Sequence, residues 1–238
     1  IQNKDKGDFP SKHITEFSVD QIESIFRELG WVRVYSDGVP GSRVCILVFH
    51  KPAQEGIYFA TSNPIKISEL NNELRDGKKR IYFYGIEIDE VKADSLEKIV
   101  EEKLKRSYEI IGYPVLCSDG GIFIEALNGF PGENSKQAAK KIGAEGILKL
   151  LKDAGERTAI RRNCIGYFDG QEVKRETVEI RCEISHEVRK KYPGYELDTI
   201  LIPDTKKNPG RLTYAEIPLE DRTELTELPH AVRFIEAL

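Results

Sequence analysis

The stretch PVLCSDGGIFIEALNGFPGENS, residues 114–135, decides the fold. Its apolar start predicts a buried strand, which we expect to end on Asp119. Gly120 and Gly121 follow, where a backbone can approach a ligand closely, and NGFPG predicts a tight loop. An aspartate in this position is a natural ligand for a hard cation such as magnesium, which takes oxygen ligands and bridges phosphates. The same aspartate would also fit an ordinary turn.

The segments around this stretch alternate between strand and helix patterns. IYFAT and KRIYFYGIEI predict strands, whereas PIKISELNNEL and SLEKIVEEKLKRSYEII predict helices. After the stretch, SKQAAKKI and EGILKLLKDA predict two helical stretches, and residues 158–184 alternate as a hairpin with a turn at FDGQ. Alternation of this kind predicts an α/β sheet.

Residues 1–54 do not share the alternating strand and helix patterns of residues 55–238. FSVDQIESIFRELGW predicts an amphipathic helix, and VRVYSDGVPGSRVCILVFH predicts two strands around a loop of Asp, Gly and Pro. KPAQEG then reads as a linker. We therefore expect a small N-terminal α/β appendage of unknown role, followed by the main domain.

Composition narrows the class of protein. The chain has 238 residues with 39% hydrophobic content, enough for a substantial core, and a formal net charge of -4. That charge argues against nonspecific binding to nucleic acid or to an anionic membrane. No apolar run approaches the ~20 residues that span a bilayer, and the first residues have no apolar signal core, so we expect a cytoplasmic protein. Four widely spaced cysteines without a CxxC pair predict reduced thiols.

The segment FATSNPIKISEL predicts a candidate phosphate site. It places Thr61 and Asn63 where a strand gives way to a helix, with Lys66 one turn further on. Backbone amides at a helix N-terminus carry partial positive charge, and a lysine beside them makes a compact anion site. Threonine and asparagine are also ordinary helix caps, so this segment alone does not decide between the two interpretations.

Four segments taken together resemble one family. TSNPIK, PVLCSDGGIFIEALNGFPGENS, EGILKLL and RLTYAEIP stand in the order of the matching motifs of the inosine triphosphate pyrophosphatase family, and the resemblance runs from Ile57 to Leu238. It implies a two-lobed α/β fold with a central mixed sheet and a cleft. The implied activity is metal-dependent hydrolysis of a non-canonical purine nucleoside triphosphate to the monophosphate and pyrophosphate. A homodimer is implied as well.

The resemblance also assigns the phosphate and metal residues. It implies that Thr61, Asn63, Lys66, Lys98 and Gly120 hold the triphosphate. The catalytic residues would be Asp119 and Lys66. The implied cofactor is Mg²⁺, with Asp119 as one ligand and Glu90 as the other, and with Glu87 and Asp89 as alternatives to Glu90.

The base would be held by residues near the C-terminus. Tyr195 matches the family's stacking aromatic, and Arg222 matches its lysine near the base. The segment PGYELD leaves open whether Glu196 or Asp198 takes the place of the family's aspartate. For the family's base-reading Ser-His-Arg triplet, the nearest match is Pro229, His230 and Ala231, with Arg233 displaced by two positions.

One departure from the family pattern supports a second hypothesis. Ser118 precedes Asp119 where the family has two adjacent acids. The chain is therefore either a nucleoside triphosphate pyrophosphatase or a nucleotide-binding sensor on the same fold. A third interpretation is an interaction protein whose functional part is residues 1–54.

Overall fold

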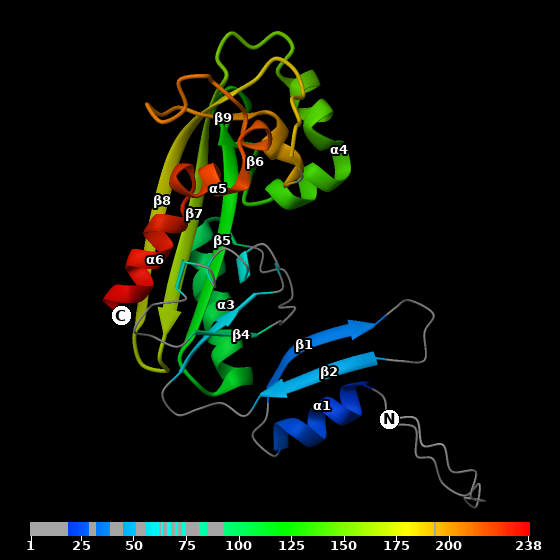
Figure 1. Cartoon of the computed structure of the whole chain (residues 1–238), viewed down its shortest axis with the longest axis vertical. Helices are drawn as coiled ribbons and strands as arrows, with labels where there is room; N and C mark the ends of the chain where they lie inside the picture. Colours follow the sequence, from blue (N-terminus) through cyan, green and yellow to red (C-terminus); the bar gives the residue numbers. More distant parts are fainter. Residues whose placement is uncertain are drawn as a thin grey trace, which may run out of the picture. The chain divides into compact units, whose positions relative to one another are not determined.

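The protein divides into two compact units, Ile1–Pro52 and Ala53–Leu238. In this computed structural model, the residues described are 19–28, 32–38, 45–50, 56–61, 63, 66–67, 70, 73–74, 81–84, 93–192 and 194–238. The first unit holds helix α1 (Val19–Glu28) and an antiparallel pair of strands, β1 (Val32–Gly38) and β2 (Cys45–His50) (Figure 1). The amphipathic helix and the two strands expected from the sequence are both present.

The second unit is built on one mixed sheet. Its strands are β3 (Ile57–Ala60), β4 (Ile81–Tyr84), β5 (Val115–Ile124), β6 (Pro131–Gly132), β7 (Thr158–Phe168), β8 (Val173–Ile184) and β9 (Leu201–Pro203). They follow the order β4-β3-β5-β7-β8-β9, and β6 pairs with β5. The β3 strand is parallel to both β4 and β5, whereas β5, β7, β8 and β9 are antiparallel in succession. The predicted α/β fold with a central mixed sheet is confirmed.

Helices and short 3-10 turns complete this unit. They are α3 (Leu96–Ile111), η1 (Glu125–Leu127), α4 (Ser135–Leu150), η2 (Glu196–Thr199), η3 (Tyr214–Glu216), α5 (Leu219–Arg222), η4 (Thr223–Leu225) and α6 (Leu228–Ala237). Ser95 caps α3 by accepting a hydrogen bond from the backbone of Lys98, and Gly112 ends it in a left-handed conformation. Gly143 interrupts α4, which explains why the sequence predicts two helical stretches there.

The two faces of the sheet are covered by different helices. Gly166 of β7 faces α3 so closely that a Cβ atom would lie 2.8 Å from side-chain carbons of Val100 and Leu104. Leu116 and Ile165 instead pack in a cluster with Leu228 and Ile235 of α6. Because neighbouring residues of a strand point to opposite faces, Ile165 and Gly166 place α6 and α3 on opposite sides. Figure 1 shows α6 lying along β8.

The predicted end of the central strand at Asp119 is wrong. The β5 strand continues to Ile124, because it pairs with β7 from Val115 opposite Phe168 to Ile124 opposite Ala159. The glycines do not stop the strand. A Cβ atom at Gly121 would lie 2.4 Å from the Gly132 carbonyl oxygen, so this glycine allows β6 to approach β5.

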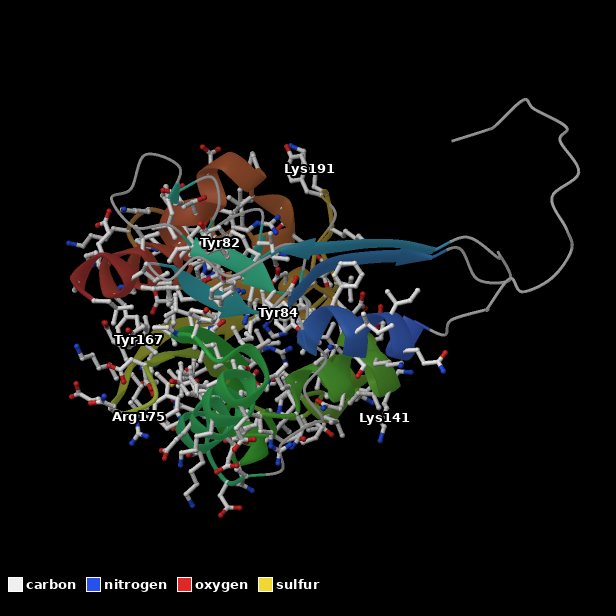
Figure 2. All side chains as sticks on the ribbon, turned by 90° about the horizontal axis from the view of Figure 1, so that it is seen from below. Tyr82, Tyr84, Lys141, Tyr167, Arg175 and Lys191 are labelled. Carbon is white, nitrogen blue, oxygen red and sulfur yellow. The ribbon has the colours of Figure 1, made fainter. Side chains whose placement is uncertain are left out.

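The second unit has tyrosine side chains on β4 and three buried thiols. Tyr82 and Tyr84 belong to β4, and the ring of Tyr58 stacks on that of Tyr82 at 5.3 Å. Arg175 and Lys141 lie at the surface (Figure 2). Free, buried thiols are found at Cys117, Cys164 and Cys182, while the side chain of Cys45 lies outside the described residues. No described helix is long and apolar enough to cross a membrane.

Candidate active site

The site begins at a gap along one edge of β5. The β3 strand pairs only with Val115 and Leu116, and β6 pairs only with Ile122 and Phe123. Within the described residues, the β5 segment between them therefore has a strand partner only in β7. The Pro114 carbonyl accepts a hydrogen bond from β3, so by the two-residue period the amides of Ser118 and Gly120 also face this gap.

The chain that leaves β3 turns into a helical segment beside this gap. The Thr61 amide donates to the Tyr84 carbonyl at 2.9 Å, and the Thr61 hydroxyl accepts from the Asn63 amide at 3.1 Å. The Asn63 carbonyl then accepts from the Ile67 amide at 3.2 Å, a helical bond. Thr61 and Asn63 thus form the strand-to-helix turn expected from the sequence, with Lys66 on the turn that follows.

Lys66 reaches across the gap to Ser118. Its Nζ donates to the Ser118 Oγ at 2.9 Å and lies 3.4 Å from the Ser118 carbonyl oxygen. Burial lowers the pKa of Lys66, against the attraction of Asp119 and Glu227, which raises it. Its described partners are thus a hydroxyl and a carbonyl, and neither neutralises the lysine charge.

Asp119 is paired with Lys103 of α3. The two side chains form an ion pair and are 26% and 25% exposed, and the second carboxylate oxygen of Asp119 accepts from the Gly120 amide at 2.8 Å. Lys98, in the first turn of the same helix, does not join them: it is exposed and lies 3.7 Å from Asp94, which precedes the helix. Lys66, Lys103, Ser118 and Asp119 are called the edge cluster below. The structure brings Lys103, and not Lys98, to this cluster.

The predicted metal ligands are only partly described. Asp119 lies in the edge cluster, whereas Glu90 and its alternatives Glu87 and Asp89 lie outside the described residues. The described part of the chain contains no group of three or more histidine, cysteine or acidic side chains that could hold a metal ion. Magnesium is often bound by one or two carboxylates together with phosphate oxygens and waters. Asp119 fits a magnesium ion of that type, which arrives with a phosphate ligand.

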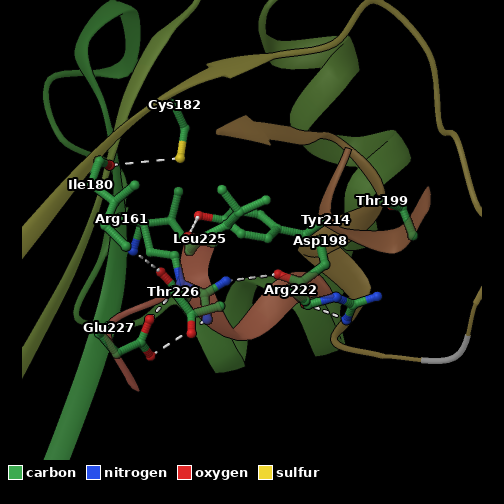
Figure 3. Close-up of polar contacts among 12 residues, drawn as sticks. Arg161, Ile180, Cys182, Asp198, Thr199, Tyr214, Arg222, Leu225, Thr226 and Glu227 are labelled. Atoms are coloured by element: carbon green, nitrogen blue, oxygen red, sulfur yellow. Dashed lines mark hydrogen bonds and ion pairs between the residues drawn. The ribbon is translucent and has the colours of Figure 1, made fainter. Parts of the chain in front are cut away.

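A second group of charges lies further along the same strands (Figure 3). Arg161 of β7 contacts Asp198 through Nη1 at 3.0 Å and Glu227 through Nε at 3.1 Å. The Asn163 amide donates to Glu227 at 3.4 Å, and the Arg161 guanidinium lies 4.9 Å from the centre of the Tyr214 ring. One arginine is therefore held by two carboxylates and an aromatic face.

Arg222 extends this group on the far side of Asp198. Its Nη1 lies 3.8 Å from the Asp198 carboxylate, and its Nη2 donates to the Ile217 carbonyl at 3.0 Å. Arg161, Asp198, Arg222 and Glu227 are called the arginine cluster below. Asp198, and not Glu196, occupies the acidic position of this cluster, because the Glu196 carboxylate lies 3.5 Å from the Ala144 amide instead.

The arginine cluster keeps Arg161 and Glu227 charged. Burial disfavours both charges, but Glu227 and Asp198 raise the pKa of Arg161 well above its ordinary value. In the same way, Arg161 outweighs the burial of Glu227 and lowers the pKa of that carboxyl. Burial raises the pKa of Asp198, with Arg161 and Arg222 opposing the shift. A charged donor and a charged acceptor thus lie side by side.

Tyr195 lies against the core beside this cluster. Its ring packs on a group of buried residues that includes Leu197 and Tyr214, and burial raises the pKa of its hydroxyl. Within the described residues, neither the Tyr195 hydroxyl nor Arg222 Nε has a hydrogen-bond partner. Asp198 is a neighbour of both residues, since its charge acts on the Tyr195 hydroxyl and its carboxylate lies 3.8 Å from Arg222, and their role toward a base stays a prediction.

His230 and Arg233 lie in a separate place on α6. The Arg233 guanidinium is 2.8 Å from His230 Nδ1, and that nitrogen is 4.0 Å from the carboxylate of Glu176 on β8. The described side-chain contacts of this pair are with each other and with Glu176. Their side chains are not paired with a member of the arginine cluster among the described contacts, although the His230 backbone amide donates to the Glu227 carbonyl at 3.1 Å.

Comparison with known proteins identifies the family of the second unit. The family model of the Ham1 family matches residues 57–236. This chain belongs to the Ham1 family. A relative from Pyrococcus horikoshii, named dITP/XTP pyrophosphatase, is 35% identical over 178 residues, 74% of this chain and 92% of the relative. Another of the same name, from Methanopyrus kandleri, is 36% identical over 189 residues, 76% of this chain and 94% of the relative.

Solved structures agree on the Ham1 fold. A HAM1 protein from Coxiella burnetii superposes with a TM-score of 0.66 at 23% identity, covering 76% of this chain and 96% of the other. A nucleoside-triphosphatase, or dITP/XTP pyrophosphatase, from Mycobacterium abscessus superposes with a TM-score of 0.60 at 21% identity, covering 76% and 97%. The predicted family resemblance is confirmed.

Four polar residues of this Ham1 chain were not predicted from the sequence. They are Lys103, Arg161, Asn163 and Glu227. The sequence contained a signal for Arg161 and Asn163, because RRN interrupts an otherwise apolar strand. Alternate positions of a strand share a face, so these two side chains point the same way. Lys103 and Glu227 lie in charged stretches that look like solvated surface, and only the fold reveals their partners.

Proposed function

We propose that this chain hydrolyses a purine nucleoside triphosphate to the monophosphate and pyrophosphate, with magnesium as cofactor. The observation that carries the proposal is the set of relatives named dITP/XTP pyrophosphatase, two of which are at least 35% identical over about three quarters of the chain. The edge cluster supports the proposal, since it gathers cations and a carboxylate at a gap in the sheet. The homodimer implied by the resemblance stays a prediction.

The triphosphate would be bound at the edge cluster. Lys66 and Lys103 carry two positive charges against the single carboxylate of Asp119, so the cluster attracts an anion. The Thr61 hydroxyl and the Ser118 amide belong to the same edge and are ordinary phosphate donors, whereas the Gly120 amide donates to Asp119. Phosphoryl transfer depends mainly on positioning and on charge neutralisation, and these groups supply both.

Asp119 would orient the attacking water. Its carboxylate accepts from the Gly120 amide, and this contact would remain when Lys103 changes its partner. Magnesium, when bound with the triphosphate at Asp119 and Glu90, would neutralise charge on the phosphates. Lys103 would exchange its contact with Asp119 for a phosphate oxygen. Asp119 would then be available to hold a water in line with the α-phosphorus.

A covalent enzyme intermediate is not part of the proposal. Cys117 is the thiol next to the site, and burial raises its pKa to about 11, so its reactive thiolate is scarce at neutral pH. The Ser118 hydroxyl faces the Lys66 ammonium and has no described base beside it. Direct attack by water needs neither group.

A nucleotide sensor on the same fold is the second candidate function. The observation that favours it is Ser118, whose hydroxyl faces Lys66 where the family pattern has an acid. A site with one carboxylate fewer could bind the triphosphate and magnesium without cutting the nucleotide.

The test is to incubate the purified protein and magnesium with a panel of triphosphates and to identify the products. The hydrolase proposal expects equal amounts of monophosphate and pyrophosphate from at least one purine substrate. Magnesium-dependent binding without any product would support the sensor. Release of orthophosphate and a nucleoside diphosphate would contradict the proposed cleavage position.

A further inference from the structure

The β5 strand changes from buried to accessible at Ser118. Residues 115–117 are buried, whereas residues 118–120 are half-buried. Lys66, which reaches this part of the strand from the neighbouring segment, is half-buried as well. A ligand can therefore reach the place where the two side chains meet.

Ser118 holds Lys66 without neutralising its charge. The Lys66 ammonium donates to the Ser118 Oγ at 2.9 Å and lies 3.4 Å from the carbonyl oxygen of the same residue. A hydroxyl and a carbonyl are neutral acceptors, so they fix the direction of the ammonium and leave its charge in place. The carboxylate that follows on the strand, Asp119, is paired with Lys103 instead.

The Ser118 hydroxyl also has a proton to donate. Its oxygen accepts from Lys66, and its own proton has no acceptor among the described contacts. A phosphate oxygen beside the two side chains would accept from both of them. A carboxylate in the place of this hydroxyl would be only an acceptor and would repel the phosphate.

We propose that Ser118 lets the edge cluster bind a polyphosphate that carries no metal ion. With serine at position 118, the cluster sets the cations of Lys66 and Lys103 against the single carboxylate of Asp119. An acid at position 118 would pair with Lys66 and remove the excess positive charge. This inference rests on the proposed function, because it places the phosphates of the substrate at the edge cluster.

Magnesium then has a smaller share in binding than in cleavage. The ion is held mainly by carboxylates, phosphate oxygens and waters, and residues 118–119 offer it one carboxylate where an acidic pair would offer two. Lys66 supplies a positive charge that does not depend on the metal. The implied ligands are therefore metal-free polyphosphates, both the triphosphate and the released pyrophosphate.

The experiment titrates inorganic tripolyphosphate into the wild type and into Ser118→Asp, once in EDTA and once in magnesium. In EDTA we expect the wild type to bind, and Ser118→Asp to bind at least roughly tenfold more weakly, because a charged contact with the phosphates is lost. Magnesium should bring the two proteins to within about threefold of each other, because the added carboxylate then has a metal to bind. Circular dichroism checks that each variant is folded.

Two control variants separate local charge from other effects. Gln171→Glu changes the net charge by the same amount at the exposed turn between β7 and β8, and it should bind as the wild type does. Ser118→Ala keeps the excess positive charge and loses only the hydroxyl, so we expect a loss of about threefold in EDTA. A loss in Ser118→Ala as large as that in Ser118→Asp would overturn the inference, because charge would then not be the cause.

The wild-type titrations separate this inference from the proposed function. Binding only in magnesium, or equal binding in EDTA by the wild type and Ser118→Asp, would overturn the inference and leave the proposed hydrolysis intact. Lack of binding in both solutions would also overturn it, together with the placement of the phosphates at the edge cluster. The product assay with purine triphosphates tests hydrolysis independently.

Discussion

The edge cluster and the arginine cluster differ in how their charges are satisfied. In the edge cluster, Lys66 is held by Ser118 and only Lys103 is ion-paired, so a positive charge remains for a ligand. In the arginine cluster, each cation faces a carboxylate and half of the side chains are nearly buried. The edge cluster can therefore exchange one of its contacts for a contact with an anion. The arginine cluster is instead held in one arrangement by its own ion pairs.

The largest expected effect is on catalysis at the edge cluster. Asp119→Asn should lower the rate of pyrophosphate release by about 100-fold or more, the usual contribution of a positioned acid or base. Its stability should change by less than about 1 kcal/mol, because the pair with Lys103 is partly exposed to solvent. Steady-state assays with ITP and thermal melts measure the two effects. Turnover equal to that of the wild type would remove Asp119 from the mechanism.

The next effect is on stability at the arginine cluster. Arg161→Met leaves the carboxylates of Asp198 and Glu227 without their shared cation, so we expect a loss of about 3 kcal/mol in the free energy of unfolding. Arg162→Met is the matched control on the opposite face of β7, where the partner Glu179 is exposed, and should cost less than about 1 kcal/mol. Urea unfolding followed by circular dichroism measures both. Equal losses would mean that the arginine cluster is not a structural unit.

A smaller effect is the pH dependence of anion binding. Burial lowers the pKa of Lys66, and a polyphosphate binds the ammonium form, so affinity should fall as the pH rises through this lowered pKa. The loss should reach about tenfold at most. Lys66→Arg stays charged at every accessible pH and should flatten the profile. Titrations from neutral to alkaline pH measure it, and parallel profiles for the two proteins would show that another group titrates.

The smallest expected effect is that of removing the first unit. The second unit contains both clusters and all strands of the mixed sheet, so a protein beginning at Ala53 should fold and melt cooperatively with little change in midpoint. Differential scanning calorimetry measures this. An insoluble product would show that residues 1–54 belong to the main core.

The fold could be predicted from the sequence because its patterns are local. The hairpin of β7 and β8 follows from alternating residues and from FDGQ, where Asp169 accepts hydrogen bonds from the amides of Gln171 and Glu172. The end of β5 could not be predicted, because the two glycines look like a stop signal. Only β7 and β6, distant in sequence, show that the strand continues.

The site could be predicted only in part, because many of its contacts join residues that are distant in the sequence. Lys66 and Asp119 belong to recognisable motifs, and the structure places both in the edge cluster. The partners in the arginine cluster come from positions 161, 198, 222 and 227, and no local pattern links these residues. A charged side chain that is buried by tertiary contacts looks in sequence like one on the surface.

The most direct test of the division between the two clusters uses a ligand without a base. Binding of inorganic tripolyphosphate in the presence of magnesium is measured by titration calorimetry for the wild type, Lys66→Ala and Glu227→Gln. If the edge cluster binds the phosphates, Lys66→Ala should bind roughly tenfold more weakly, and Glu227→Gln should match the wild type within about twofold. An unchanged dissociation constant in Lys66→Ala, or an equal loss in Glu227→Gln, would contradict this account.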